Sequence, residues 1–254
     1  MDAIVLAGGV PDPDSPLYPF SKGKPKAAID IGGKPMLQWV LDALEKAETI
    51  NRIVVVGCED LQGKLQSTKV SSYQPTGTDM ISSFKSGADA ILDLNPDAVE
   101  IAVVSADIPL LTPESVDWVI HTSLESNQEI YYCVIDQPTM ENKYPESART
   151  YTSLKDMDVC GGDIAVINLD LYTQKKEFWG KITRARKSSL RMAAIIGIDI
   201  LLLLVLRRLT LEDTVNRITR RLDITGKGLH CPYPEIAMDI DKPYQLELAR
   251  RELG

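Results

Sequence analysis

Short continuous apolar runs alternate with helical segments along the first half of the chain. Three apolar runs have the length of strands: residues 3–7, 52–57 and 100–106. Three other segments repeat apolar residues at helical spacing: residues 35–48, 79–92 and 113–125. Continuous apolar runs are typical of parallel strands buried on both faces, and strands that alternate with helices form right-handed βαβ units. We therefore expect an α/β fold, with a mostly parallel central sheet and helices on both faces.

The second half of the chain continues this pattern with one interruption. Further strands are expected at residues 129–135, 163–168 and 236–240. A closing helix is expected over residues 243–252. Residues 186–222 have a mostly helical pattern, so we expect a helical insertion at about 183–228. No repeat, low-complexity tract or linker divides the chain, which predicts one domain over residues 1–254.

Charge and cysteine content exclude several classes of protein. The formal net charge of the 254 residues is −8, so the overall field repels nucleic acid, although a small anion can still bind a local basic pocket. The four cysteines are widely spaced, with no C-x-x-C pair, which fits a reducing compartment and contains no zinc signature. The first residues lack the basic region and apolar length of a signal peptide. We expect a cytoplasmic protein without a nucleic-acid partner.

The first apolar run ends in the turn Leu6-Ala7-Gly8-Gly9. Ligands of open parallel sheets bind beyond the carboxyl ends of the strands, and glycines there let backbone N–H groups approach phosphate oxygens. The alternative is that both glycines only form the turn. Neither the Walker pattern nor the dinucleotide fingerprint follows this run.

Three lysines follow this turn within five residues: Lys22, Lys24 and Lys26. Such a group can neutralise a triphosphate and stabilise a pyrophosphate leaving group. Taken alone, however, the three lysines are better explained as a solvated surface patch.

Three aspartates are candidates for binding a metal. Asp107 follows the apolar run 100–106, where a carboxylate can bridge a divalent cation to phosphates, or can simply cap the next turn. Asp239 and Asp241 alternate along an expected strand, so both side chains would lie on one face. Two close carboxylates repel unless a cation or proton intervenes. Asp241 has an equal alternative as the N-cap of the helix that begins at Lys242-Pro243.

Together these segments resemble a known family. Their order matches the motifs of the nucleotidyltransferase superfamily with a GT-A-like fold, the nucleotide-diphospho-sugar transferase type: residues 6–9, 26–37, 105–112 and 239–243. The branch with the most similar motifs is that of the molybdenum-cofactor guanylyltransferase-like (MobA-like) NTP transferases. The motifs span nearly the whole chain and are more specific for the superfamily than for a substrate.

The resemblance implies roles for individual residues. It implies that Lys26 and Asp107 are catalytic, and that Mg²⁺ is bound by Asp107 with Asp239 or Asp241. It implies a nucleotide site formed by Leu6, Ala7, Gly8, Gly9, Lys22, Lys24, Lys26, Gln74, Gly77 and Thr78. It implies an acceptor site at Gly161, Gly162 and Asp163. Thr78 has an alternative as a helix N-cap, and Gly161-Gly162 as a turn before a strand at 164–168.

The chain departs from the resembled family in its first loop. Relatives often carry an arginine shortly after the double glycine, whereas residues 8–26 contain none. Lys22 or Lys24 can take its place only as a point charge, without the bidentate fork of arginine. An acidic, proline-rich stretch at 11–16 also lengthens this loop. Triphosphate binding is therefore expected to differ in detail from that of relatives.

The implied activity is transfer of a nucleoside monophosphate from an NTP to a small phosphorylated acceptor, with Mg²⁺ and release of pyrophosphate. An ionised acceptor phosphate needs positioning and charge neutralisation more than a general base. One alternative is a glycosyltransferase, because Asp239-Ile240-Asp241 has the D-x-D form, although it lies unusually late in the chain. A second alternative is a non-catalytic nucleotide-binding protein, which the altered first loop favours.

Residues 181–208 combine basic side chains with the apolar run 192–206. The run is shorter than the roughly 20 residues of a spanning helix and contains Asp199. Burial in the domain or in an interface between copies is the favoured interpretation, because the run is apolar nearly all round. Weak contact with a membrane surface is the alternative, because basic residues flank the run.

Overall fold

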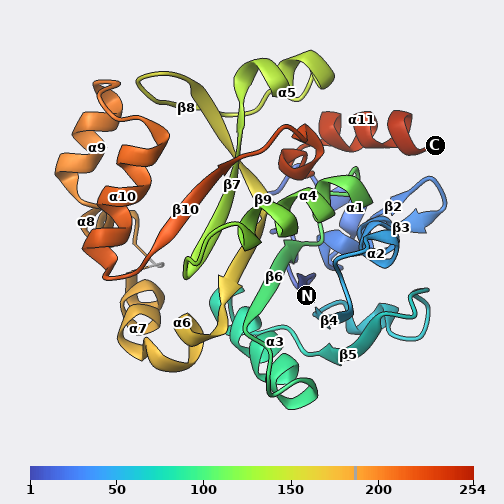
Figure 1. The fold of residues 1–254 in the computed structure, drawn as a ribbon. Coiled ribbons are helices and arrows are strands. Elements are labelled where there is room, and N and C mark those ends of the chain that lie inside the picture. Colours follow the sequence, from blue (N-terminus) through green and yellow to red (C-terminus); the bar gives the residue numbers. More distant parts are fainter. Residues whose placement is uncertain (186–187) are drawn as a thin grey trace.

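A computed structural model describes residues 1–185 and 188–254 of the chain (Figure 1). Its main sheet has eight strands in the order β10-β7-β9-β6-β1-β4-β5, with β8 paired to β9. The strands are β1 (Asp2–Leu6), β4 (Arg52–Val56), β5 (Val70–Gln74), β6 (Glu100–Ser105), β7 (Ile130–Asp136), β8 (Thr152–Ser153), β9 (Asp158–Asn168) and β10 (Gly226–His230). A separate hairpin joins β2 (Asp30–Ile31) to β3 (Lys34–Pro35).

Most neighbouring strands of the main sheet are parallel. Strand β1 pairs in parallel with β4 and β6, as do β4 with β5 and β7 with β10. Strand β9 reverses this direction, because it is antiparallel to β6, β7 and β8. The expected mostly parallel sheet is therefore confirmed, with one long antiparallel strand inside it.

Helices cover both faces of this sheet. They are α1 (Tyr18–Ser21), α2 (Met36–Lys46), α3 (Met80–Leu94), α4 (Pro113–Leu124), α5 (Gln137–Lys143), α6 (Leu169–Gln174), α7 (Lys176–Ala185), α8 (Ser189–Ile196), α9 (Ile198–Val205), α10 (Leu211–Leu222) and α11 (Pro243–Leu253). Successive strand residues point to opposite faces. In β1, Ala3 and Val5 pack with α2, α4 and α11, whereas Ile4 packs with α3 and α6.

Local sequence explains where the helices next to the site begin. Thr112 caps α4 in a capping box with Ser115, and Pro113 occupies the first turn. Asp79 caps α3 in the same way with Ser82. These caps fix the chain directly after β5 and β6, at the carboxyl edge of the sheet.

The predicted strand at 236–240 is wrong. Residues Pro234–Ala237 form a 3₁₀ helix, and an irregular segment leads from there to α11. The last strand of the sheet is instead β10, which pairs with β7 and overlaps the end of the range expected as a helical insertion. Apolar content alone did not distinguish a buried 3₁₀ turn from a short buried strand, because both are fully covered.

Two further boundaries differ from expectation. The apolar run 192–206 is two helices, because Gly197 adopts a φ of 108°, in the left-handed region that favours glycine. Gly161 and Gly162 are not a turn but lie inside β9. A Cβ on Gly162 would lie 2.8 Å from Ile236 Cγ2, and one on Gly161 would collide with the Tyr132 hydroxyl. Close packing, not a turn, requires these two glycines.

The first loop also contains more structure than expected. Residues 10–26 include the short helix α1, and Lys26–Ala28 form a 3₁₀ turn. Strand β5 and helix α5 had no clear sequence pattern and were not expected. No helix in the described part of the chain has the length and apolar content needed to cross a membrane.

Candidate functional site

The carboxyl ends of β1 and β6 lie side by side at one edge of the sheet. Leu6 is in register with Ser105, and the Ala106 N–H donates to the Leu6 carbonyl at 3.1 Å. The loop after β1 therefore runs directly beside Asp107. Sequence placed both segments at strand ends, and parallel pairing brings them to the same edge.

Lys26 links this loop to the carboxylates beyond β6. Its backbone N–H donates to the Gly9 carbonyl at 2.7 Å, which fixes the returning chain against the loop. Its Nζ lies 2.5 Å from Asp107 Oδ2 and 2.7 Å from Asp241 Oδ1. Burial by itself would lower the pKa of Lys26, but these two carboxylates outweigh it and hold the pKa above its ordinary value. Lys26 is therefore a cation at neutral pH.

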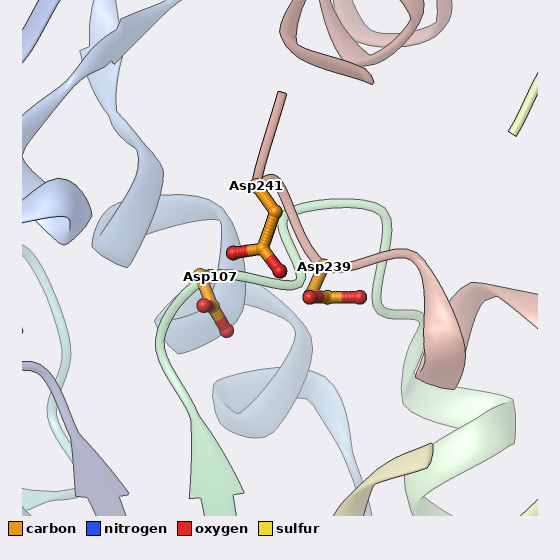
Figure 2. A group of neighbouring side chains, drawn as sticks. All are labelled: Asp107, Asp239 and Asp241. Carbon is orange, nitrogen blue, oxygen red and sulfur yellow. The ribbon is translucent and has the colours of Figure 1, made fainter. Parts of the chain in front are cut away.

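Three carboxylates lie close to one another, as Figure 2 shows, and two of them contact this lysine. Asp107, Asp239 and Asp241, here called the acidic cluster, each offer an oxygen within 4.8 Å of the others. The Ile240 N–H donates to the Asp107 carbonyl at 2.9 Å, which anchors the segment carrying the other two aspartates. Asp239 and Asp241 were expected to share one face of a strand, but that strand is absent. The hydrogen bond from Ile240 and the adjacent 3₁₀ helix position the two side chains instead.

Arg149 and Asp163 complete the charged surroundings of the acidic cluster. Arg149 forms an ion pair with Asp239, and both side chains are largely buried. Burial, with the nearby Asp107 carboxylate as the next cause, raises the pKa of Asp163 to about 7. Lys26 and Arg149 oppose that rise but do not cancel it. The group therefore contains four carboxyl groups against two cations.

A pocket of about 340 Å³ opens next to Lys26 and Asp107. Its size falls within the range of about 300–1,000 Å³ that is usual for small-molecule sites. Seven of the residues expected to bind nucleotide line it: Leu6, Ala7, Gly8, Gly9, Lys26, Gly77 and Thr78. Thr76, within the segment 74–78 that the resemblance places at the base or ribose, lines it as well. Its other lining residues were not predicted from sequence: Ala27, Asp79, Met80, Ser83, Ser105 and Ala106.

Three residues expected at the nucleotide site lie elsewhere. Lys22 ends α1 in a left-handed conformation and is exposed. Lys24 lines a separate, smaller cavity with Glu59 and Lys64. Gln74 donates from Nε2 to Ser72 Oγ at 2.9 Å within β5. Neither Lys22 nor Lys24 lines the pocket in this structure, so their expected role at the triphosphate stays a prediction.

The proposed capping alternatives are wrong. The N-cap of α3 is Asp79, so Thr78 is not the cap. The N-cap of α11 is Lys242, and Asp241 instead directs its carboxylate to Lys26. Arg149 had no motif or periodicity that pointed to it, because it lies in the irregular chain between α5 and β8.

The two glycines of the first turn have different surroundings. A Cβ on Gly8 would lie 2.6 Å from Thr76 Cβ, and one on Gly57 would lie 2.5 Å from Gly8 Cα. The turns after β1 and β4 are thus in direct backbone contact. A Cβ on Gly9 would meet no protein atom within 4 Å, and Gly9 lines the pocket. Gly8 is needed for packing, whereas Gly9 leaves room for a ligand.

A pocket beyond the carboxyl ends of parallel strands, bordered by a lysine and an acidic cluster, defines the class of GT-A-like NTP transferases. The chain belongs to the family described as the MobA-like NTP transferase domain, whose pattern matches residues 3–178. The expected superfamily and branch are therefore confirmed. The β10 strand and the α8–α11 helices lie outside the matched range.

Similar proteins agree with this assignment. A probable molybdenum cofactor guanylyltransferase of Thermococcus gammatolerans is 31% identical over 49% of this chain and 59% of its own. A 2-C-methyl-D-erythritol 4-phosphate cytidylyltransferase of Bifidobacterium longum is 29% identical over 45% of this chain and 40% of its own. The chain thus matches less than two thirds of either relative. A hypothetical transferase from Thermus thermophilus has a TM-score of 0.83 and 27% identity, with 96% of this chain and 98% of that one covered.

Proposed function

We propose that the protein transfers a nucleoside monophosphate from an NTP to a small phosphorylated acceptor, with Mg²⁺, and releases pyrophosphate. The observation that carries the proposal is the convergence of Lys26 and the acidic cluster at the mouth of the pocket. The names of the two relatives support the nucleotidyl-transfer step. The base and the acceptor are left open.

The donor set of the acidic cluster fits Mg²⁺. Carboxylate oxygens are its preferred protein ligands, and Mg²⁺ sites usually combine one or two carboxylates with substrate phosphates. The excess of carboxyl groups over cations also favours a divalent ion, since like charges held this close otherwise repel. When bound, Mg²⁺ would neutralise charge on the transferred phosphate. Asp107, with Asp239 or Asp241, would hold it.

The pocket suits the base and ribose of the NTP. Its walls are backbone and small side chains from the turns after β1 and β5, which let a flat group approach closely. Lys26 is the one cation among the described residues that line it, and it lies beside Asp107, so the triphosphate would point there. Lys26 would contact the phosphates and stabilise the charge of the leaving pyrophosphate.

Arg149 and Asp163 support an acceptor next to the acidic cluster, outside the pocket. Arg149 is paired with Asp239, the charge of Asp107 acts on Asp163, and neither Arg149 nor Asp163 lines the pocket. An acceptor phosphate there would attack the α-phosphorus in line. Because such a phosphate is already largely ionised near neutral pH, the step requires orientation and not a general base.

The deciding experiment measures pyrophosphate release with Mg²⁺, each of the four NTPs, and a panel of phosphorylated acceptors. Asp107→Ala should abolish turnover, since loss of one charge-stabilising group typically lowers kcat by about 10²–10³-fold. Asp97→Ala, at an exposed turn, is the matched control and should retain full activity. Chelation of the metal should stop both the wild type and the control.

The same experiment separates the alternatives. Sugar transfer from a sugar nucleotide, without pyrophosphate release, would favour a glycosyltransferase. Tight NTP binding with no turnover for any acceptor would favour a non-catalytic nucleotide-binding protein. Near-normal rates for Asp107→Ala, with its secondary structure unchanged, would remove Asp107 from the mechanism.

A further inference from the structure

Helices α8 and α9 form a projecting part of the molecule beside α10 and β10 (Figure 1). One side of α9 is packed: Ile200 is fully buried, and Leu204 contacts a small apolar cluster of the β7, β8 and β9 region. The two residues are four apart, so they lie on one face of the helix. This face attaches α9 to the domain.

The opposite side of α9 is also apolar, but it is exposed. Ile198, Leu202, Val205 and Leu206 are 57–81% exposed and recur at helical spacing. Leu190 of α8 is 84% exposed. The four exposed apolar residues between 198 and 206 are here called the apolar face. Single exposed apolar side chains are ordinary on a protein surface, but a group of this size along one helix marks an interaction surface.

Basic residues flank the apolar face in the sequence. Residues 181–208 contain seven lysines or arginines and one acid, Asp199, whereas the whole chain has a net charge of −8. Asp199 is paired with Arg221 at 3.0 Å, so its charge is compensated. Within the described residues, Arg184, Arg191 and Arg208 are exposed and form no ion pair. Arg207 is paired with Asp158 at 3.5 Å. The segment that carries the apolar face is therefore rich in cations, whereas the whole chain is anionic.

We infer that the apolar face docks on an anionic lipid surface, with α8 and α9 lying in the plane of the interface. An apolar side flanked by lysine and arginine is the pattern of interfacial helices, and neither helix is long enough to span. Anionic headgroups complement the flanking basic residues. A symmetric contact with a second copy would instead bring the same basic residues together.

Flotation of the whole protein with vesicles tests this inference directly. Vesicles of phosphatidylcholine with phosphatidylglycerol, at about 3:1, should carry the protein upward, whereas phosphatidylcholine alone should not. Raising the salt concentration should weaken the binding, since the electrostatic contribution is screened. A wild-type protein that stays at the bottom with anionic vesicles at low salt overturns the inference.

Paired variants locate the contact. Leu202→Glu with Val205→Glu should lower the vesicle-bound fraction at least about tenfold, because two apolar side chains no longer enter the interface. Leu124→Glu with Val99→Glu makes the same change at residues of similar exposure elsewhere, and binding should persist. Equal loss in both pairs, or no loss in the first pair, refutes docking through α9.

Light scattering tests the alternative that a second copy of the protein covers the apolar face. The wild type without vesicles should be monomeric at micromolar concentration. A stable dimer that Leu202→Glu with Val205→Glu dissociates, in a protein that does not float, would assign the apolar face to a second copy and overturn the inference.

Discussion

Substitution of the two glycines in the first turn by alanine should separate folding from ligand binding. At Gly8 the added methyl group would lie 2.6 Å from Thr76 Cβ, so the turns after β1 and β5 must move apart. Overpacking of this kind costs about 1–3 kcal/mol of stability. At Gly9 the methyl group meets no protein atom within 4 Å, and φ is not in the left-handed region. Gly9→Ala should therefore stabilise the fold by about 0.4–1 kcal/mol, because alanine lowers the conformational entropy of the unfolded chain.

For nucleotide binding we expect the opposite order, with the larger effect from Gly9→Ala. The Gly9 methyl group would occupy the space into which a ligand must fit, since Gly9 lines the pocket beside Lys26. If it overpacks the bound NTP as severely as a core substitution does, binding weakens by about 1–3 kcal/mol, or roughly 5- to 150-fold in Kd. Gly8 also lines the pocket, but its added methyl group would meet Thr76, so Gly8→Ala should change Kd less than Gly9→Ala does.

Two measurements on each variant test this reasoning. Chemical denaturation gives the free energy of unfolding, and calorimetric titration with the Mg²⁺ complex of the best NTP gives Kd. Gly33→Ala serves as a control outside the pocket. Because Gly33 has a φ of 89°, alanine at this position should lower the free energy of unfolding. Wild-type NTP affinity in Gly9→Ala would refute the placement of the nucleotide. Wild-type stability in Gly8→Ala would refute the packing against Thr76.

Three further outcomes are expected. Lys26→Met should lower kcat by about 10²–10³-fold in the pyrophosphate assay, and a variant with unaltered kcat would show that Lys26 only balances the carboxylates. Lys143→Ala should destabilise the protein by about 1–3 kcal/mol in denaturant titration, because it leaves the buried carboxylate of Glu235 without the partner now 2.8 Å away; a Cm equal to that of the wild type would contradict this. Hydrogen bonds from residues 67–69 outweigh burial and lower the pKa of Glu45 to about 2. The Glu45 carboxylate therefore adds stability above its unfolded pKa of 4.5, and this is lost as the pH falls toward 2. The Tm difference between wild type and Glu45→Gln should shrink over that window, and a difference independent of pH would exclude the linkage.

Much of the pocket was predictable from sequence. The apolar runs before Gly8 and Asp107 are long enough to be recognised as buried strands, and the segments between them have clear helical spacing. Parallel strands place their carboxyl ends at one edge, so the two motifs had to meet there. The resemblance then supplied Lys26, which the structure places between Asp107 and Asp241.

The acidic cluster was predicted with the correct residues but for a reason that the structure does not support. Asp239 and Asp241 were expected on one face of a strand, whereas a backbone bond from Ile240 to Asp107 brings them to the site. Over five residues, the sequence pattern of a strand cannot be told from that of an irregular segment. Only a contact between positions more than a hundred residues apart distinguishes them.

By itself the sequence determined the alternation of strands and helices, the edge at which the site lies, and the family. These follow from apolar spacing and short motifs, which act over a few neighbouring residues. Tertiary structure alone decided that Arg149 meets Asp239, that Lys22 and Lys24 do not line the pocket, and that one side of α9 remains uncovered. Each depends on which distant segments pack together, and packing selects among local conformations that differ little in free energy.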